Sequence, residues 1–568
     1  MKTNYYVFFA LSIVLLANIG CNKMPKHAEY IPKDALLVGA VDMNKMAKKM
    51  IWNAVTGSAM FEEMQKDFKN EKSKEAMKDF SSIGLNQGST IYFFYTGSLR
   101  RDSKICFLVG MKNQKQFEEF IQKNMEGIKI QPHDGYKSAQ IESSVYAAWN
   151  EDVAMFFPMR SEVSDSLSTD MQLEAETDST FNALTMDSAP EFNTTSSIET
   201  FLKTAFKLTK ENSIVALPNF KTLQNDGHDV SIWANYEEIF NQNQDLNTSE
   251  MQAFIKKDYF KDAALATGID FEKGTTAITM DYFMSKDLAD IYKKYSNKNV
   301  NEDLVKKIPS NDVAFIAAYN FQPQMIQDFL KKFSLDGLAN LGLMMIGTSM
   351  DKITSTFKGD MVFAVTDINI KDTIQKIPDS DIELVVEPQM NFSFAMAIKD
   401  ESAVDELLNK GVKQSILTKE GAMYTMSGGT ILKNKDLLVF SSKKDMAEKF
   451  LNGKNDIETV IPKDVMKNVK NNPMAMYLDM KKIMQFIPEQ DMTAEDKVLL
   501  TETKNMFTYI EMYGGKMKNN ANHFEGNVFF SNKDENSLIQ LLNLAMKLKK
   551  NEDAKQAKVP QTDTTIVL

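Results

Sequence analysis

Short apolar runs alternate along the chain with polar turns and with segments of helical apolar spacing. Residues 105–123 (ICFLVGMKNQKQFEEFIQK) predict a strand, a turn and a helix, in that order. Residues 392–410 (FSFAMAIKDESAVDELLNK) align with them without a gap and predict the same three elements. The apolar stripe of the two predicted helices is formed by Phe117, Phe120 and Ile121 in the first segment and by Val404, Leu407 and Leu408 in the second.

Four further segments recur in the same order. Residues 31–46 match a segment that begins at residue 308, residues 146–157 one that begins at 430, and residues 228–240 one that begins at 472. Residues 265–295 resemble residues 513–546. The first four blocks along the chain have offsets of 278, 287, 284 and 244; Asp34, for example, matches Asp312 (312 − 34 = 278). Five blocks in the same order predict an internal duplication.

The recurring strand–turn–strand segments also predict the fold class. Strands joined by short polar turns pair antiparallel, and an antiparallel sheet commonly buries one face under helices. We therefore expect an α+β fold with two homologous halves, residues 30–300 and 301–548, of mainly antiparallel sheet with helices packed on one face and a pseudo-twofold relationship. The pattern leaves open whether the halves are separate domains or share one continuous sheet.

The drop in offset from 284 to 244 locates an insertion of 40 residues (284 − 244 = 40) in the first half, at about residues 159–197. This stretch is rich in Ser, Thr and acidic residues and lacks apolar periodicity, which predicts a flexible surface loop. A Ca²⁺ site is the alternative, although no cage-forming spacing of carboxylates is present. Residues 549–568 are expected to form a disordered C-terminal tail.

The N-terminus predicts where the protein works. Lys2 followed by the apolar run 5–17 is typical of a signal peptide (residues 1–20), since about 13 residues make a helix of roughly 20 Å, too short to cross a bilayer. Gly20 precedes Cys21 as in a bacterial lipobox, although Asn18 and Ile19 depart from the usual pattern. We expect lipidation of Cys21, a short tether over residues 21–29, and attachment to the membrane through this lipid; a plain secreted protein is the alternative.

The bulk composition excludes some partners. The chain has 66 basic and 77 acidic residues, a net charge of −11, which disfavours nucleic acid as a partner. Cys106 is the only other cysteine and lies in an apolar strand-like run, so a buried, unreactive thiol is expected.

The four histidines, His27, His133, His228 and His523, have no metal-ligand spacing and are expected to be solvated or capping residues. The run Ser441–Lys444 satisfies S-x-x-K but lacks the accompanying K-T-G, so a helix-capping serine is favoured over a nucleophile.

Three pairs of polar residues recur in the duplicated blocks. Asp34 and Asp312 are conceivable as a catalytic carboxylate pair, but their Ile-Pro context favours a turn. The pairs Asp42/Asn320 and Asn235/Asp479 each end a predicted strand before a helix, which favours N-capping. The sequence therefore predicts no catalytic, metal-binding or cofactor-binding residue and no cofactor.

The lipobox, the strand opening with Ile-Pro-Lys-Asp and the tandem α+β halves together resemble a family of uncharacterised Bacteroidetes lipoproteins that carry a domain of unknown function. The resemblance implies no established activity or catalytic residues. Asn22–Lys26 contains no acidic residue, which favours a periplasm-facing anchor in the outer membrane of such bacteria.

Three functions are compatible with these features. The first is a non-enzymatic, lipid-anchored binding or scaffold protein of the cell envelope with a protein partner. The second is an envelope carrier or chaperone for an apolar ligand, which a deep cavity lined by Met and Phe would favour, since the chain has 37 of each. The third is a hydrolase without a recognisable motif. Stripes such as Met474, Met476, Met480 and Met484 are expected to fill the core.

Overall fold

The computed structural model describes residues 24–558, apart from 50–79, 98–102, 126, 143–144, 160–193, 244–259, 346, 370–373, 377–382, 386–388, 454–456, 458–459, 488 and 490–491. The described residues form two compact units, of which unit 1 holds residues 24–49 and 80–243 and unit 2 holds residues 260–558. The predicted signal peptide, Cys21 and most of the acidic insertion lie outside the described residues. None of the described helices combines the length and the apolar character needed to cross a membrane.

Unit 1 is an antiparallel sheet of eight strands in the order β4-β5-β6-β7-β3-β2-β1-β8. Its elements are η1 (Lys26–Tyr30), β1 (Leu37–Asp42), α2 (Met43–Lys48), η2 (Phe80–Ile83), β2 (Thr90–Thr96), β3 (Lys104–Gly110), α6 (Gln114–Asn124), β4 (Gln131–His133), β5 (Tyr136–Glu142), β6 (Val145–Trp149), β7 (Val153–Pro158), α7 (Thr195–Ala205), η4 (Lys210–Asn212), η5 (Ile214–Ala216), α8 (Pro218–Asp226), β8 (Val230–Ala234) and α9 (Tyr236–Asn243).

Unit 2 is built on twelve antiparallel strands in the order β9-β10-β22-β21-β20-β11-β12-β15-β19-β18-β17-β16, with β13 and β14 as a separate hairpin. Its strands are β9 (Ala264–Glu272), β10 (Thr275–Phe283), β11 (Val313–Asn320), β12 (Phe357–Asn369), β13 (Ile374–Lys376), β14 (Glu383–Val385), β15 (Gln389–Ile398), β16 (Thr418–Glu420), β17 (Met423–Met426), β18 (Gly429–Lys433), β19 (Leu437–Ser441), β20 (Met474–Asp479), β21 (Phe507–Lys518) and β22 (Ala521–Phe530).

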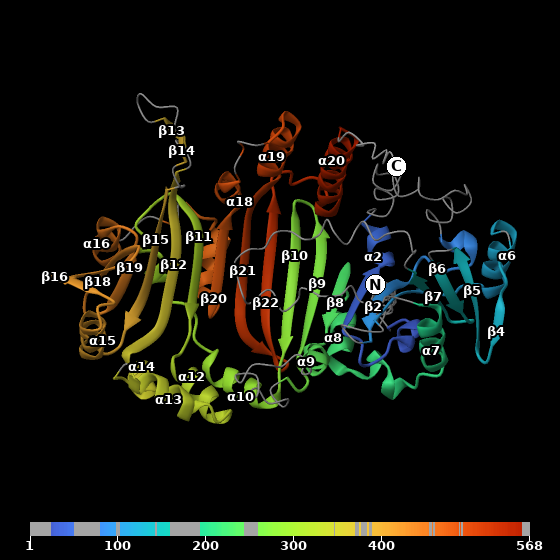
Figure 1. Ribbon diagram of the computed structural model, residues 1–568, viewed down its shortest axis with the longest axis horizontal. Coiled ribbons are helices and arrows are strands. Elements are labelled where there is room, and N and C mark those ends of the chain that lie inside the picture. The colour runs from blue at the N-terminus through green and yellow to red at the C-terminus, as the bar shows by residue number, and fades with distance from the viewer. Residues whose placement is uncertain are drawn as a thin grey trace, which may run out of the picture. The chain divides into compact units, whose positions relative to one another are not determined.

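The helices of unit 2 gather largely at the two ends of its long strands, with α10 and α12–α14 at one end and α18–α20 at the other (Figure 1). They are α10 (Lys286–Tyr295), α11 (Glu302–Val305), α12 (Gln324–Lys332), α13 (Asp336–Met345), α14 (Met350–Thr356), α15 (Glu401–Lys413), α16 (Lys444–Asn452), α17 (Lys463–Asn471), α18 (Met480–Ile483), η10 (Met484–Phe486), α19 (Ala494–Met506) and α20 (Ser537–Lys558). The α+β class and the antiparallel pairing predicted from the sequence are confirmed.

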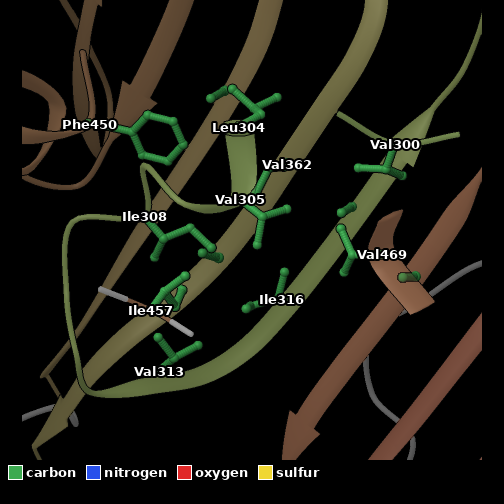
Figure 2. Packing of buried hydrophobic residues seen from close by; sticks show 14 of the residues in the cluster. Val300, Leu304, Val305, Ile308, Val313, Ile316, Val362, Phe450, Ile457 and Val469 are labelled. Carbon is green, nitrogen blue, oxygen red and sulfur yellow. The ribbon is translucent and has the colours of Figure 1, made fainter. Parts of the chain in front are cut away.

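The main core of unit 2 lies between one face of its sheet and the helices α11, α16 and α17. Ile316 on β11 and Val362 on β12 are almost completely buried there, and Phe450 of α16 and Val469 of α17 pack into the same cluster (Figure 2). Each such side chain contributes about 1.5–3 kcal/mol relative to an exposed one. This burial holds the sheet and these helices together.

Helices pack on both faces of each sheet, so the expectation of helices on one face is wrong. In unit 1, the consecutive β7 residues Phe156 and Phe157 point to opposite faces, where Phe156 contacts Phe117 of α6 and Phe157 contacts Phe201 of α7. In unit 2, Leu438 packs against α15 on one face of the sheet. Its neighbour Val439 packs on the opposite face, in the main core with α16 and α17. The physical reason is that these strands carry apolar residues at successive positions, so both faces have apolar surface to bury.

Three boundaries differ from those expected. The units divide at Asn243 and Gln244, earlier than residue 300, because β10 pairs along its whole length with the distant strand β22. The tether is shorter than residues 21–29, because η1 begins at Lys26 and its His27 and Ala28 are buried. The helix α20 continues to Lys558, into the expected tail, where Lys555 pairs with Asp496 of α19 at 2.8 Å.

Candidate functional site

The predicted lipidation site, Cys21, lies outside the described residues, but the chain from Lys26 onward is held by contacts within unit 1. Tyr30 of η1 donates a hydrogen bond to Asp152, and Lys26 pairs with the same carboxylate at 2.8 Å. His27 is 3% exposed and its Nε2 lies 2.7 Å from the Thr90 carbonyl. His27 is therefore a structural residue of unit 1, and the expectation that it is solvated is wrong.

Most of the recurring polar residues have structural roles. The side chains of Asp42 and Asp479 accept hydrogen bonds from the backbone of α2 and α18, and Asn235 accepts one from the Glu238 amide, as predicted for N-caps. Asn320 is different: it is buried and donates to Asp360, so it caps no helix.

Two further predictions concern turns and serines. Asp34 lies in a turn of unit 1, whereas Asp312 lies in unit 2 between the bend at Asn311 and the start of β11, where it pairs with Lys482. Ser441 is buried on β19 and donates to the Phe392 carbonyl, while the Ser442 hydroxyl accepts from the Phe392 amide. The N-cap of α16 is Lys443, which makes no side-chain capping bond, so the capping role predicted for this serine pair is wrong.

His523 belongs to a polar network across β10, β22 and β21. Its Nδ1 lies 2.6 Å from Asp281 and its Nε2 3.4 Å from Glu525, and Tyr513 donates to Glu525 at 2.8 Å. The hydrogen bond to Asp281 raises the pKa of His523, although burial opposes it. His523 is thus neither solvated nor a cap, and the network ties three strands together.

Glu511 on β21 is a further polar residue with side-chain partners. It accepts hydrogen bonds from Asn527 at 2.9 Å and from Asn468 at 3.3 Å, and burial raises the pKa of its carboxyl. Within the described residues, no group of three or more His, Cys, Asp or Glu side chains is arranged to hold a metal ion.

Two surface pockets lie in unit 1. One, of about 470 Å³, is lined by Met24 of the tether together with Lys210, Glu211 and Lys221. The other, of about 480 Å³, lies beside Tyr146 and Glu199. Neither has the lining of methionine and phenylalanine that a carrier of apolar ligands would need.

Several methionine and phenylalanine side chains lie on the second face of the sheet in unit 2, opposite the main core. Directly paired residues of neighbouring strands point to the same face, so the strand register defines a row across nine strands. This row consists of Phe440, Phe394, Phe363, Ala317, Met476, Met512, Gly526, Ile278 and Ile269.

Two further rows flank the first and complete what we call the apolar face. One consists of Leu438, Met396, Met361, Tyr319, Met474, Gly514, Phe524 and Met280, and the other of Phe392, Val365, Phe315, Leu478, Ile510 and Val528. Most of these side chains are half-buried. Met474 and Met476, expected in the core, lie on this face.

Contacts between aromatic rings hold side chains of the apolar face in position relative to one another. Phe315 and Phe363 have ring centroids 6.0 Å apart, and those of Phe392 and Phe440 are 5.3 Å apart. The cluster of α15 covers the end of the face at Leu438. In Figure 1, none of the described helices crosses in front of β21, β22 and β10.

The alternation within one strand segment is a sequence signal for this face. Met390–Ile398 (MNFSFAMAI) places Phe392, Phe394 and Met396 at alternate positions, with small or polar residues between them. The larger side chains thus belong to the face opposite the core, which only the three-dimensional packing reveals.

Comparisons with known proteins add little. No protein-family model matches the chain, and no curated protein matches its sequence. Solved structures of TP0453 of Treponema are similar at a low level: crystal form IV has a TM-score of 0.26 and 8% identity over 49% of this chain and 87% of that one. Crystal form III has a TM-score of 0.24 and 7% identity over 49% and 88%. Similarity at this level supports no transfer of function, and the resemblance to Bacteroidetes lipoproteins stays a hypothesis from the sequence.

Proposed function

We propose that the chain is a non-enzymatic, lipid-anchored binding or scaffold protein of the cell envelope, whose partner-binding surface is the apolar face of unit 2. The observation that carries the proposal is the series of paired apolar residues, from Phe440 to Ile269, that lie on the sheet face opposite the core and stay largely half-buried. A single antiparallel sheet usually presents polar side chains on the face away from its core. An apolar second face is therefore a surface that a partner covers.

The dimensions of the face favour a protein partner over a small apolar ligand. Nine strands at about 4.8 Å spacing extend over roughly 38 Å, a width comparable to that of a standard protein–protein interface. The two pockets of about 470 and 480 Å³ among the described residues lie in unit 1 and not on this face. A surface of this width suits a folded or extended polypeptide.

The polar side chains that could suggest catalysis have structural partners, which supports a non-enzymatic role. Asp42 and Asp479 cap helices, and His523 joins β22 to Asp281 of β10. Attachment through a lipid on Cys21, at the periplasmic side of the outer membrane, is part of the proposal and rests on the lipobox and on the absence of acidic residues in Asn22–Lys26.

We also infer that the two halves arose by duplication, and the strand register supports this. In unit 1, direct pairing joins Ile232, Gly39, Phe93, Phe107 and Phe156 in one row. In unit 2, the strands with the same connectivity place Met476, Ala317, Phe363, Phe394 and Phe440 in the corresponding row.

The numbering of these two rows agrees with the sequence repeat. The differences 476 − 232 = 244, 317 − 39 = 278, 394 − 107 = 287 and 440 − 156 = 284 equal the four offsets of the sequence blocks. The apolar row thus occupies matching positions of the repeat.

Site-specific photo-crosslinking in cells tests the proposed function. A photoreactive amino acid replaces Phe363 on the apolar face, and the same amino acid replaces Lys435 in an exposed turn as the matched control. We expect the Phe363 position, but not the Lys435 position, to capture one stoichiometric envelope protein. Co-purification of lipid without any crosslinked protein would overturn the scaffold proposal in favour of a carrier of apolar ligands.

A further inference from the structure

The most exposed apolar side chains of unit 2 lie on the short helix α13. Leu338, Leu341 and Met344 are 59%, 63% and 68% exposed. Their spacing of three residues places them within about 120° of arc on one side of the helix. Gly337 and Gly342 border this stripe, and a Cβ atom at either glycine would meet no other atom within 4 Å. The stripe therefore protrudes from the protein and does not line a groove.

The neighbouring helix α12 continues the apolar surface. Ile326 and Phe329 lie one turn apart on α12 and are 37% and 36% exposed. The two helices contact each other. Together they form an apolar surface, named here the α12–α13 surface, that consists of Ile326, Phe329, Leu338, Leu341 and Met344.

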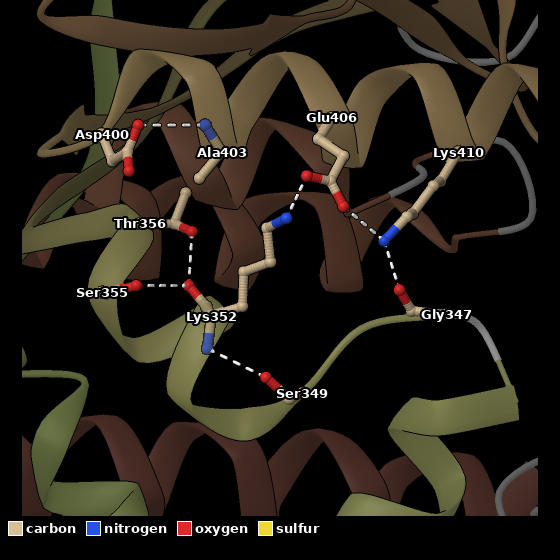
Figure 3. A network of polar contacts seen from close by, with 9 residues as sticks. All are labelled: Gly347, Ser349, Lys352, Ser355, Thr356, Asp400, Ala403, Glu406 and Lys410. Carbon is tan, nitrogen blue, oxygen red and sulfur yellow. Dashed lines mark hydrogen bonds and ion pairs between the residues drawn. The ribbon is translucent and has the colours of Figure 1, made fainter.

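Polar contacts from α15 and α14 hold this surface in place (Figure 3). Lys410 of α15 donates to the carbonyl of Gly347, two residues after the end of α13, and pairs with Glu406 at 2.7 Å. Glu406 also pairs with Lys352 of α14, and the two lysines lower the pKa of Glu406 to about 2. Asn340, within α13, accepts a hydrogen bond from the amide of Met350, the first residue of α14, at 3.1 Å. These contacts hold α13, and with it the exposed stripe, in a fixed position relative to α14 and α15.

The surface carries little charge of its own, and lysines border it at the end of α12. Residues 334–349 (SLDGLANLGLMMIGTS) contain one ionisable side chain, Asp336, at the start of α13. Two exposed lysines, Lys331 and Lys332, end α12 immediately before this stretch, with Lys332 also 3.0 Å from Asp287. An uncharged apolar stripe bordered by lysines is the pattern of helices that lie in a membrane interface.

The short stretch of chain between Cys21 and the first described residue also favours a bilayer as the partner of this surface. Cys21 precedes the first described residue, Met24, by three positions, which span at most about 10 Å. The lipid on Cys21, on whose presence in the proposed function this step rests, would keep the chain close to a bilayer, and a bilayer accepts a protruding apolar stripe without requiring a complementary shape. We propose that the α12–α13 surface inserts into the interface of an anionic lipid bilayer and forms a second membrane contact besides the lipid.

Vesicle binding of the chain carrying Cys21→Ala tests this proposal, because that chain has no lipid anchor. The probe is vesicles of phosphatidylethanolamine mixed with phosphatidylglycerol, followed by flotation. We expect binding to these vesicles, and Leu338→Asp and Leu341→Asp to weaken it about tenfold or more, since a charge at the interface opposes burial of the stripe. The matched control is Val498→Asp on α19, whose parent side chain is also 59% exposed, and which should leave binding unchanged.

A second variant reports insertion directly. Leu341→Trp should show a blue-shifted emission on vesicle addition and quenching by brominated lipid, whereas Val498→Trp should show neither. Absence of vesicle binding, or equal loss of binding in the Leu341→Asp and Val498→Asp variants, would overturn the proposal. These variants leave the apolar face unaltered. Failure of vesicle binding therefore does not affect the crosslinking test at Phe363, and the two proposals are tested separately.

Discussion

The Nδ1 atom of His523 on β22 lies 2.6 Å from the Asp281 carboxylate on β10, and the two residues are directly paired in the sheet. Glu525 on the same strand lies 3.4 Å from the other ring nitrogen, while Lys518 of β21 acts in the opposite sense and lowers the pKa. The net effect is a pKa raised above the ordinary value of 6.5, with the hydrogen bond to Asp281 as its largest cause. His523 therefore joins two strands of unit 2 most strongly when it is protonated.

We expect Asp281→Asn to lower the stability of unit 2 by about 1.5–3 kcal/mol at acidic pH, the usual contribution of a hydrogen bond to a charged group. Because folding raises the pKa, the contribution is fully present below pH 6.5 and is lost as the pH rises through the raised pKa. Urea unfolding of the wild type and the variant at about pH 5.5 and about pH 9 measures the difference. An equal loss at both pH values would show that protonation of His523 has no role.

His27 in unit 1 behaves in the opposite way. It is 3% exposed, and burial lowers its pKa below 6.5 despite the hydrogen bond to the Thr90 carbonyl. Its contribution to stability is therefore present above pH 6.5 and is lost as the pH falls through the lowered pKa. We expect His27→Gln, which can still donate to Thr90, to reduce the acid sensitivity of unit 1.

Tryptophan fluorescence measures this effect in unit 1, because none of the three tryptophans, Trp52, Trp149 and Trp233, lies within residues 260–558. Urea midpoints of the wild type should fall on acidification more than those of His27→Gln. The control His133→Gln, at a half-buried position on β4, should follow the wild type. A His27→Gln variant as acid-sensitive as the wild type would contradict the prediction.

Cys106 gives an independent probe of unit 1. It is a free cysteine, fully buried on β3, and burial raises the pKa of its thiol well above the ordinary value, which agrees with the unreactive cysteine expected from the sequence. In the Cys21→Ala chain, we expect a maleimide to label Cys106 only after unfolding. Labelling of the native chain at the rate of a free thiol would be inconsistent with this packing.

Cys21 itself remains the most specific prediction from the sequence. Cys21→Ala should release the protein from the membrane fraction under high-salt washing, because a covalent lipid supplies most of the membrane affinity. Fractionation followed by mass spectrometry of the N-terminal peptide measures both the release and the loss of the acyl mass. Unchanged membrane association at high salt would contradict lipidation at this position.

The local features of the fold were predictable because they depend on neighbouring residues. The capping roles of Asp42 and Asp479 follow from a polar residue between a strand and a helix, and the hairpins follow from polar turns between apolar runs. The failure at Asn320 shows the limit of such reasoning. Its sequence context resembles that of Asp42, yet its amide donates to Asp360 on the neighbouring strand, a contact between residues 40 apart.

The apolar face and the packing of His27 depend on contacts between segments far apart along the chain. Composition and spacing placed Met474 and Met476 among core residues, because alternation in a strand does not tell which face a helix covers. His27 and Thr90 are 63 residues apart, so the burial of the segment after Cys21 could not be inferred locally. Both features follow from strand order, which apolar periodicity leaves undetermined.

Gly39 on β1 contributes no side chain to the row of paired residues that runs from Ile232 to Phe156 in unit 1. Ala317 occupies the corresponding position in unit 2. The ring of Phe93 lies over Gly39, so that a Cβ atom there would lie 1.8 Å from Cε1 of that ring. We expect Gly39→Ala to force the Phe93 ring away and to destabilise unit 1 by about 1–3 kcal/mol, the usual cost of overpacking. Tryptophan fluorescence during urea unfolding measures the loss.

The double variant Gly39→Ala/Phe93→Ala separates this steric effect from any effect of the alanine on the backbone. If the clash is the cause, removal of the ring relieves it, and the double variant should be more stable than the sum of the two single variants predicts. Additive losses would mean that Gly39 is required for another reason. Relief of the clash would further indicate that the methyl group of Ala317 and the ring of Phe93 fill corresponding space on the two apolar rows.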